Sequence, residues 1–126
     1  MKTLIFWVSL FSMFLTGEAM ACRECIKLGK NEPFIASSNV SFTKLMEDSM
    51  HLMEDRMSKA DLKGKNEKIF IEMMIAHHQG ALDMANSILV HSKDVTVQNY
   101  ARSIISSQYN EILYMQTLLK NYDRKL

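Results

Sequence analysis

Two adjacent histidines stand among methionines in the segment 70–91. Met74 precedes the pair His77-His78, and Met84 follows it. Thioether sulfur and neutral imidazole are ligands suited to copper, particularly Cu(I), whereas Mg²⁺ and Ca²⁺ prefer oxygen ligands. The segment therefore predicts a soft-metal site, with ordinary helix packing as the alternative interpretation.

The same segment has the periodicity of a helix. Steps of four and three residues join one unbroken series: Phe70, Met74, His77, Ala81, Met84, Ile88 and His91. Such a series forms one stripe on a helix, so we expect His77 to point inward. A buried imidazole needs a partner for each ring nitrogen, and hydrogen bonds or a metal ion would supply them. The further presence of His78, His91 and several methionines favours the metal.

A row of sulfur atoms is predicted on the preceding helix. Its methionines advance by four, three and four residues: Met46, Met50, Met53 and Met57. This spacing places them within about 60° of arc. Methionine rows are more often adaptable core than metal ligands. Eight methionines follow residue 21, and this number favours a metal role. His51 projects away from the row and is expected in solvent.

Turn and cap residues divide the chain into an extended segment and three helices. Pro33 and its polar neighbours make 22–38 the extended segment, and the helical domain covers 39–126. The expected helices are 39–60, 66–92 and one that opens at 94–96 and persists nearly to residue 122. The candidate caps are Ser38, Asn39 or Ser41, then Asn66, then Asp94 or Thr96. The predicted fold class is all-α, an antiparallel bundle of three main helices.

Short connections between the helices predict which residues are level with one another. The connection after His91 would place the segment 108–111 opposite His77, and the connection before it would place Met50 and Met53 level with His77 and Met74. The predicted metal ligands are His77, His78, His91, Met46, Met50, Met53, Met74, Met84 and Met115.

Two polar residues and a second site complete the predicted metal centre. Glu111 and Gln108 would orient an imidazole N–H, as metal-bound histidines usually require. For Glu111, a structural hydrogen-bonded carboxylate is the equal alternative. His91 and Met84 would mark a second, weaker site near the connection to the third helix.

The first 21 residues have the pattern of an export signal. Lys2 precedes an apolar run, and Ala19-Met20-Ala21 fits the small-x-small cleavage pattern. We therefore expect a periplasmic or secreted protein, bound to a membrane only if the signal is uncleaved or Cys22 is lipidated. In an oxidising compartment Cys22 and Cys25 form a disulfide by default, with a Cu(I)-thiolate pair as the alternative.

Several functional classes have no support in the sequence. The net charge is +1 and no long basic stretch is present, so nucleic acid is not an expected partner. The chain has no His-Glu-x-x-His motif, no Gly-x-Ser-x-Gly motif and no inward Glu-x-x-His pair. We therefore do not expect an enzyme.

A longer pattern resembles a known family. It comprises Phe70, Met73-Met74, His77-His78-Gln79-Gly80-Ala81, Asp83-Met84-Ala85, Ala101, Ile104, Gln108, Glu111-Ile112 and Met115. Over 42–122 the chain is similar to the domain-of-unknown-function 305 (DUF305) family. The resemblance implies an exported, ferritin-like helical protein involved in copper binding and copper resistance, with His77, His78 and the nearby methionines as functional positions. A four-helix bundle would then need a second chain, such as a homodimer, or the signal segment.

The expected function is that of an exported protein that buffers, sequesters or transfers copper, as Cu(I) and also Cu(II). Its expected partners are the copper ion and a periplasmic copper donor or acceptor protein. The alternative is a Met-rich helical module for protein interaction or self-association, without a metal role.

Overall fold

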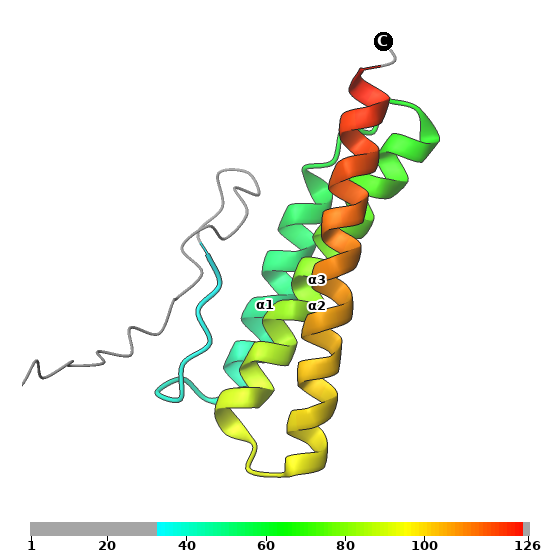
Figure 1. The fold of residues 1–126 in the computed structure, drawn as a ribbon. Helices are drawn as coiled ribbons and strands as arrows, with labels where there is room; N and C mark the ends of the chain where they lie inside the picture. Colours follow the sequence, from blue (N-terminus) through cyan, green and yellow to red (C-terminus); the bar gives the residue numbers. More distant parts are fainter. Residues whose placement is uncertain (1–32, 125–126) are drawn as a thin grey trace, which may run out of the picture. The chain divides into compact units, whose positions relative to one another are not determined.

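Three α-helices make up the regular structure of residues 33–124, the part of the chain that the computed structural model describes (Figure 1). They are α1, Phe42–Ser58, α2, Asn66–His91, and α3, Val95–Asp123. Residues 33–37 have no regular secondary structure. The predicted all-α fold of three main helices is confirmed. The predicted export signal and Cys22-Cys25 lie outside the described residues.

The caps follow the sequence at two of the three helix starts. The Ser41 hydroxyl accepts a hydrogen bond from the amide of Lys44, and the Asp94 carboxylate accepts from the amides of Thr96 and Val97. Such side chains satisfy amides that have no partner within the helix. The predicted cap at Asn66 is wrong, because Asn66 is the first residue of α2 and the preceding residue provides no side-chain cap.

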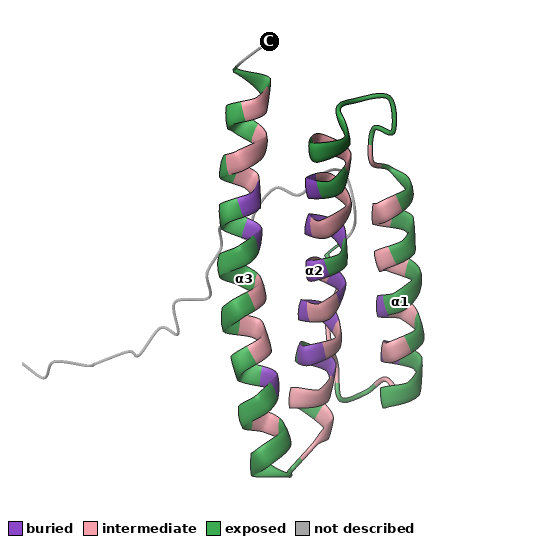
Figure 2. Cartoon of the chain, turned by 90° about the vertical axis from the view of Figure 1, so that its right-hand side faces the viewer, coloured by how far each residue is buried: buried purple, intermediate pink, exposed green. Residues whose placement is uncertain are grey.

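α2 is the central helix of the described region. It lies between α1 and α3, and no Cα atom of α1 lies within 8 Å of a Cα atom of α3 (Figure 2). Lys68 in the first turn of α2 pairs with Asp123 at the end of α3, with 2.9 Å between Nζ and Oδ1. The two helices therefore run in opposite directions.

Because α2 has a neighbour on each side, it buries two stripes rather than one. The stripe toward α3 consists of Ile71, Ile75, His78, Leu82 and Ala85, and the stripe toward α1 consists of Ala76, Gly80, Asp83 and Ser87. The other helices bury fewer residues, which are Leu45 and Ser49 on α1 and Ala101, Ile112 and Met115 on α3. The core therefore follows α2, as the purple segments in Figure 2 show.

None of the three helices is both long and apolar enough to cross a lipid bilayer; this finding covers only residues 33–124.

Candidate metal centre

His78 is the buried histidine of the adjacent pair, with only 7% of its surface exposed. Its Nε2 lies 2.6 Å from Oε2 of Glu111 on α3. In a neutral ring Nε2–H donates this hydrogen bond, and Nδ1 keeps a free lone pair. Nδ1 is buried and has no hydrogen-bond partner among the described residues. The structure therefore presents one imidazole nitrogen oriented by a carboxylate and one without a partner.

The expectation that His77 points inward is wrong, because His77 is exposed. The buried stripe toward α3 is shifted by one residue from the predicted stripe, which contains Phe70 and His77. The two rings lie 6.0 Å apart, centroid to centroid, with 64° between their planes. The two residues differ in burial, since His78 is buried and His77 is exposed.

Sulfur lies one helical turn from the His78–Glu111 contact on both helices. Met74 precedes His78 by four residues, and Met115 follows Glu111 by four. Because the two helices run in opposite directions, these methionines are level with each other. Met115 is buried, whereas Met74 and Gln108 are half-buried. The predicted pairing of α2 with the segment 108–111 is confirmed, with His78 rather than His77 as the contacting residue.

The register of α1 against α2, that is, which of their residues lie opposite each other, differs from the prediction. Phe42 lies against His91, with 5.9 Å between ring centroids, and Met53 lies against Gly80. Equal numbers of residues separate these contacts on the two helices, so they define one register. Met53 is therefore level with Gly80 rather than with Met74 or His77. Met50 is exposed and lies one turn further from His77.

Gly80 permits a close approach of α1. A Cβ atom at this position would lie 2.7 Å from both Cγ and Sδ of Met53 and 2.8 Å from its Cβ. Glycine costs about 0.5–1 kcal/mol in a helix relative to alanine. The close approach of the Met53 side chain accounts for glycine at this position.

His51 and His91 have different surroundings. His51 is exposed as predicted, and its Nδ1 lies 4.0 Å from Oε2 of Glu54. His91, the last residue of α2, is half-buried, and its Nε2 is buried without a hydrogen-bond partner among residues 33–124. Met84 and Met46 are also half-buried.

The described residues contain no group of three or more His, Cys, Asp or Glu side chains placed to hold a metal ion. The donors nearest to His78 along the two helices are the thioether groups of Met74 and Met115, each one turn from the His78–Glu111 contact. Such a donor set suits a soft ion.

Comparison with known families places the whole described region in one of them. Residues 24–124 match the family described as "Domain of unknown function (DUF305)". The chain belongs to the DUF305 family. This match spans all three helices and the His78–Glu111 contact. No match was found among curated proteins.

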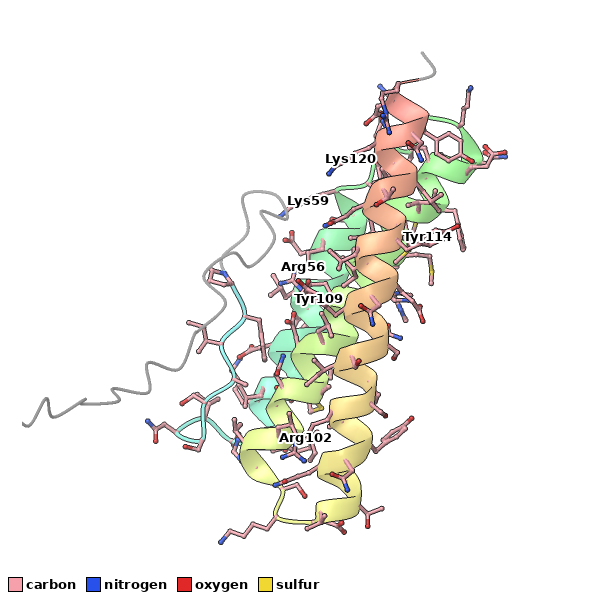
Figure 3. The ribbon with its side chains drawn as sticks, viewed as in Figure 1. Arg56, Lys59, Arg102, Tyr109, Tyr114 and Lys120 are labelled. Carbon is pink, nitrogen blue, oxygen red and sulfur yellow. The ribbon has the colours of Figure 1, made fainter. Side chains whose placement is uncertain are left out.

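One polar contact of this DUF305 chain was not predicted. Arg56 on α1, labelled in Figure 3, donates from a guanidinium N–H to Oδ2 of Asp83, 2.5 Å away. Only 13% and 5% of the two side chains are exposed. Gln79 also donates to Asp83, at 3.3 Å. Burial raises the pKa of Asp83 above its ordinary value of 3.8, outweighing the opposite effect of Arg56.

A signal for this ion pair is present in the sequence. Asp83 is the only acidic residue of α2 after Glu72, and it stands in an otherwise apolar stretch. Buried carboxylates are usually paired. The isolated acid therefore indicates a cation on a neighbouring helix.

Proposed function

We propose that this DUF305 protein is an exported copper-binding protein that buffers, sequesters or hands on copper. The observation that carries the proposal is the state of the buried His78 ring. Its Nε2 is held by Glu111, while its Nδ1 has no hydrogen-bond partner among the described residues. Leaving a buried polar atom unpaired costs about 1–3 kcal/mol. A metal ion bound at Nδ1 would remove this cost.

The chemistry around His78 favours Cu(I). Met74 and Met115 place thioether sulfur one turn from the ring, and sulfur with imidazole suits this soft ion. A carboxylate on the other ring nitrogen fixes the orientation of the imidazole and raises its basicity as a ligand. Glu111 is in position for this role, because its Oε2 lies 2.6 Å from Nε2 of the ring.

The sequence before the helices supports an exported location. Residues 1–21 have the pattern of a cleaved signal. The proposed partners are the copper ion and a periplasmic protein that delivers or accepts it. Cu(II) would bind more weakly at this centre, because thioether sulfur contributes less to a harder ion.

Metal competition tests the function directly. We expect the purified chain to retain Cu(I) against a Cu(I) chelator and to lose Zn²⁺ to a chelator of comparable strength, because sulfur adds more to Cu(I) than to Zn²⁺. The measurement is the bound metal per chain at increasing chelator concentration. Equal or stronger retention of Zn²⁺ would contradict the proposal.

Replacing Glu111 by glutamine tests the orienting carboxylate. We expect Cu(I) affinity to fall by about ten- to a hundredfold, the usual effect of losing a partner of a metal-bound histidine. The helices should stay folded, because the Glu111 side chain is largely exposed. Chelator competition gives the affinity, and circular dichroism gives the fold. Unfolding with unchanged copper affinity in the folded fraction would assign Glu111 a structural role instead.

Self-association is the second candidate function. Three aromatic side chains of the helices are exposed: Phe70, Tyr100 and Tyr114. Tyr109 and Tyr114 lie on different sides of α3 (Figure 3), so aromatic rings are available on more than one side. The measurement that distinguishes the two functions is the molar mass in solution with and without Cu(I). A constant dimer that binds no copper would favour the interaction module.

A further inference from the structure

The end of α2 carries a second buried nitrogen that the His78 centre does not use. His91 is the last residue of α2, and its Nε2 has no hydrogen-bond partner among the described residues. The Phe42 ring from the start of α1 lies against it, with 59° between the ring planes. The His91 ring therefore packs at the junction between the start of α1 and the end of α2.

The register of α1 and α2 places Met46 on the face of α1 that carries Phe42, one turn further along the helix. Met46 follows Phe42 by one turn, so it is level with Ser87, one turn before His91. Side chains on a helix lean toward its N-terminus. Because Phe42 lies against the C-terminal end of α2, the side chain of Met46 leans toward His91, while the ring of His91 leans toward the level of Met46. Both side chains therefore lean toward the same level between the two helices.

Because helical side chains lean toward the N-terminus, the side chains of His91 and Met84 are also kept apart. Met84 lies two turns before His91 on α2, and its side chain leans further away from it. A metal site formed by His91 and Met46 is therefore more favourable than the predicted site formed by His91 and Met84. Met46 is half-buried.

We propose that His91 Nε2 and Met46 Sδ form a second binding site for Cu(I), separate from the His78 centre. This inference rests on the proposed copper function and extends it to a second position. Imidazole and thioether provide the soft, neutral donors that Cu(I) takes at low coordination number. The position at the C-terminus of α2 adds to this preference, because unpaired carbonyl groups there favour a cation. Phe42 covers one side of the His91 ring.

Two conservative variants and one control test this site. His91→Leu removes the nitrogen, and Met46→Leu removes the sulfur while keeping a similar volume. His51→Ala is the control, since it removes an exposed histidine of α1 that lies away from the junction. Native mass spectrometry on the full mature chain titrated with Cu(I) counts the bound ions, and circular dichroism confirms folding.

We expect each leucine variant to bind one Cu(I) fewer than the wild-type chain and the His51→Ala variant to bind as many. The remaining ion in the leucine variants should be lost when His78 is also replaced by alanine. If both leucine variants keep the wild-type number of ions and the wild-type affinities, the second site is wrong. A wild-type chain that binds no Cu(I) would overturn the proposed function, and the second site with it.

A measurement in the wild-type chain avoids any effect of substitution on folding. Methionine methyl groups labelled with ¹³C report on sulfur ligation when Ag(I), a redox-stable probe for Cu(I), is added. We expect the Met46 methyl and the His91 ring resonances to shift together at the same Ag(I) ratio. Shifts confined to Met74, Met115 and His78 would contradict the second site and leave the first one intact.

Discussion

Replacing His78 by alanine should reduce Cu(I) affinity by more than about a hundredfold. Losing only a hydrogen-bond partner of a metal-bound histidine usually costs about ten- to a hundredfold. Replacing His77 by alanine should change the Cu(I) affinity much less. The structure buries His78 against Glu111 and exposes His77. The two variants remove the same side chain from adjacent positions of one helix, so each is a matched control for the other. Chelator competition provides the affinities.

The comparison also separates ligand loss from loss of folding. His78→Ala leaves a space between α2 and α3, and its thermal midpoint should be measured beside its copper affinity. His78→Gln keeps more of the volume and a hydrogen-bonding group, but lacks the imidazole nitrogen. A folded His78→Gln variant with wild-type Cu(I) affinity would show that the copper centre is elsewhere. Equal losses for the His77 and His78 variants would contradict the assignment of His78 alone.

Replacing Asp83 by alanine should lower the free energy of unfolding by about 3–5 kcal/mol, because it leaves the cation of Arg56 buried without its partner. Asp48→Ala is the matched control. Asp48 pairs with Lys44 on the exposed surface of α1, and such pairs contribute about 0–1 kcal/mol. Denaturant unfolding gives both values. An Asp83 variant no less stable than the Asp48 variant would contradict a structural role for the ion pair.

Removing both charges should recover most of the lost stability. In an Arg56→Met/Asp83→Leu variant no buried charge remains unpaired, and such replacements are often neutral. The effect should depend on pH. Burial raises the pKa of Asp83 in the folded chain, so this carboxyl contributes stability below its unfolded pKa and loses it as the pH rises through the folded pKa. The double variant should therefore gain stability relative to the wild type from acidic pH toward neutrality.

Local signals in the sequence were sufficient for the helices and for one of the two interfaces. Asp94 caps α3 as expected, and only three residues separate the last residue of α2 from the first residue of α3. So short a connection leaves little freedom of register, and it correctly placed the segment containing Glu111 opposite the histidine pair. A residue-level pairing could therefore be predicted without knowledge of the packing.

Which face of α2 is buried could not be predicted in the same way. A helix with one buried side shows one apolar stripe, but α2 packs on two neighbours and carries two further stripes besides the predicted one. The series that begins at Phe70 and the series that begins at Ile71 both continue at helical spacing. Periodicity alone cannot decide between His77 and His78 when a helix is apolar over most of its circumference.

The register of α1 was wrong for a different reason. The seven residues that separate Ser58 from Asn66 fold back over the start of α2, where the amide of Asp61 donates to a carboxylate oxygen of Glu72, 3.0 Å away. A connection of this length does not fix which turns face each other. The prediction assumed a direct reversal, and it therefore placed Met50 and Met53 too far toward the start of α2.

Because no Cα atom of α1 lies within 8 Å of one in α3, the described domain has two separate helix interfaces, or seams: α1 with α2, and α2 with α3. Local opening of a protein usually follows such seams, and amide hydrogen exchange reports it. If α1 detaches, the amides of α1 and the His91 end of α2 become exposed, while the His78–Glu111 seam stays closed. Exchange in α1 should then proceed by openings that α3 does not share. Two ions bound at the two seams would leave the chain at rates set by two independent motions.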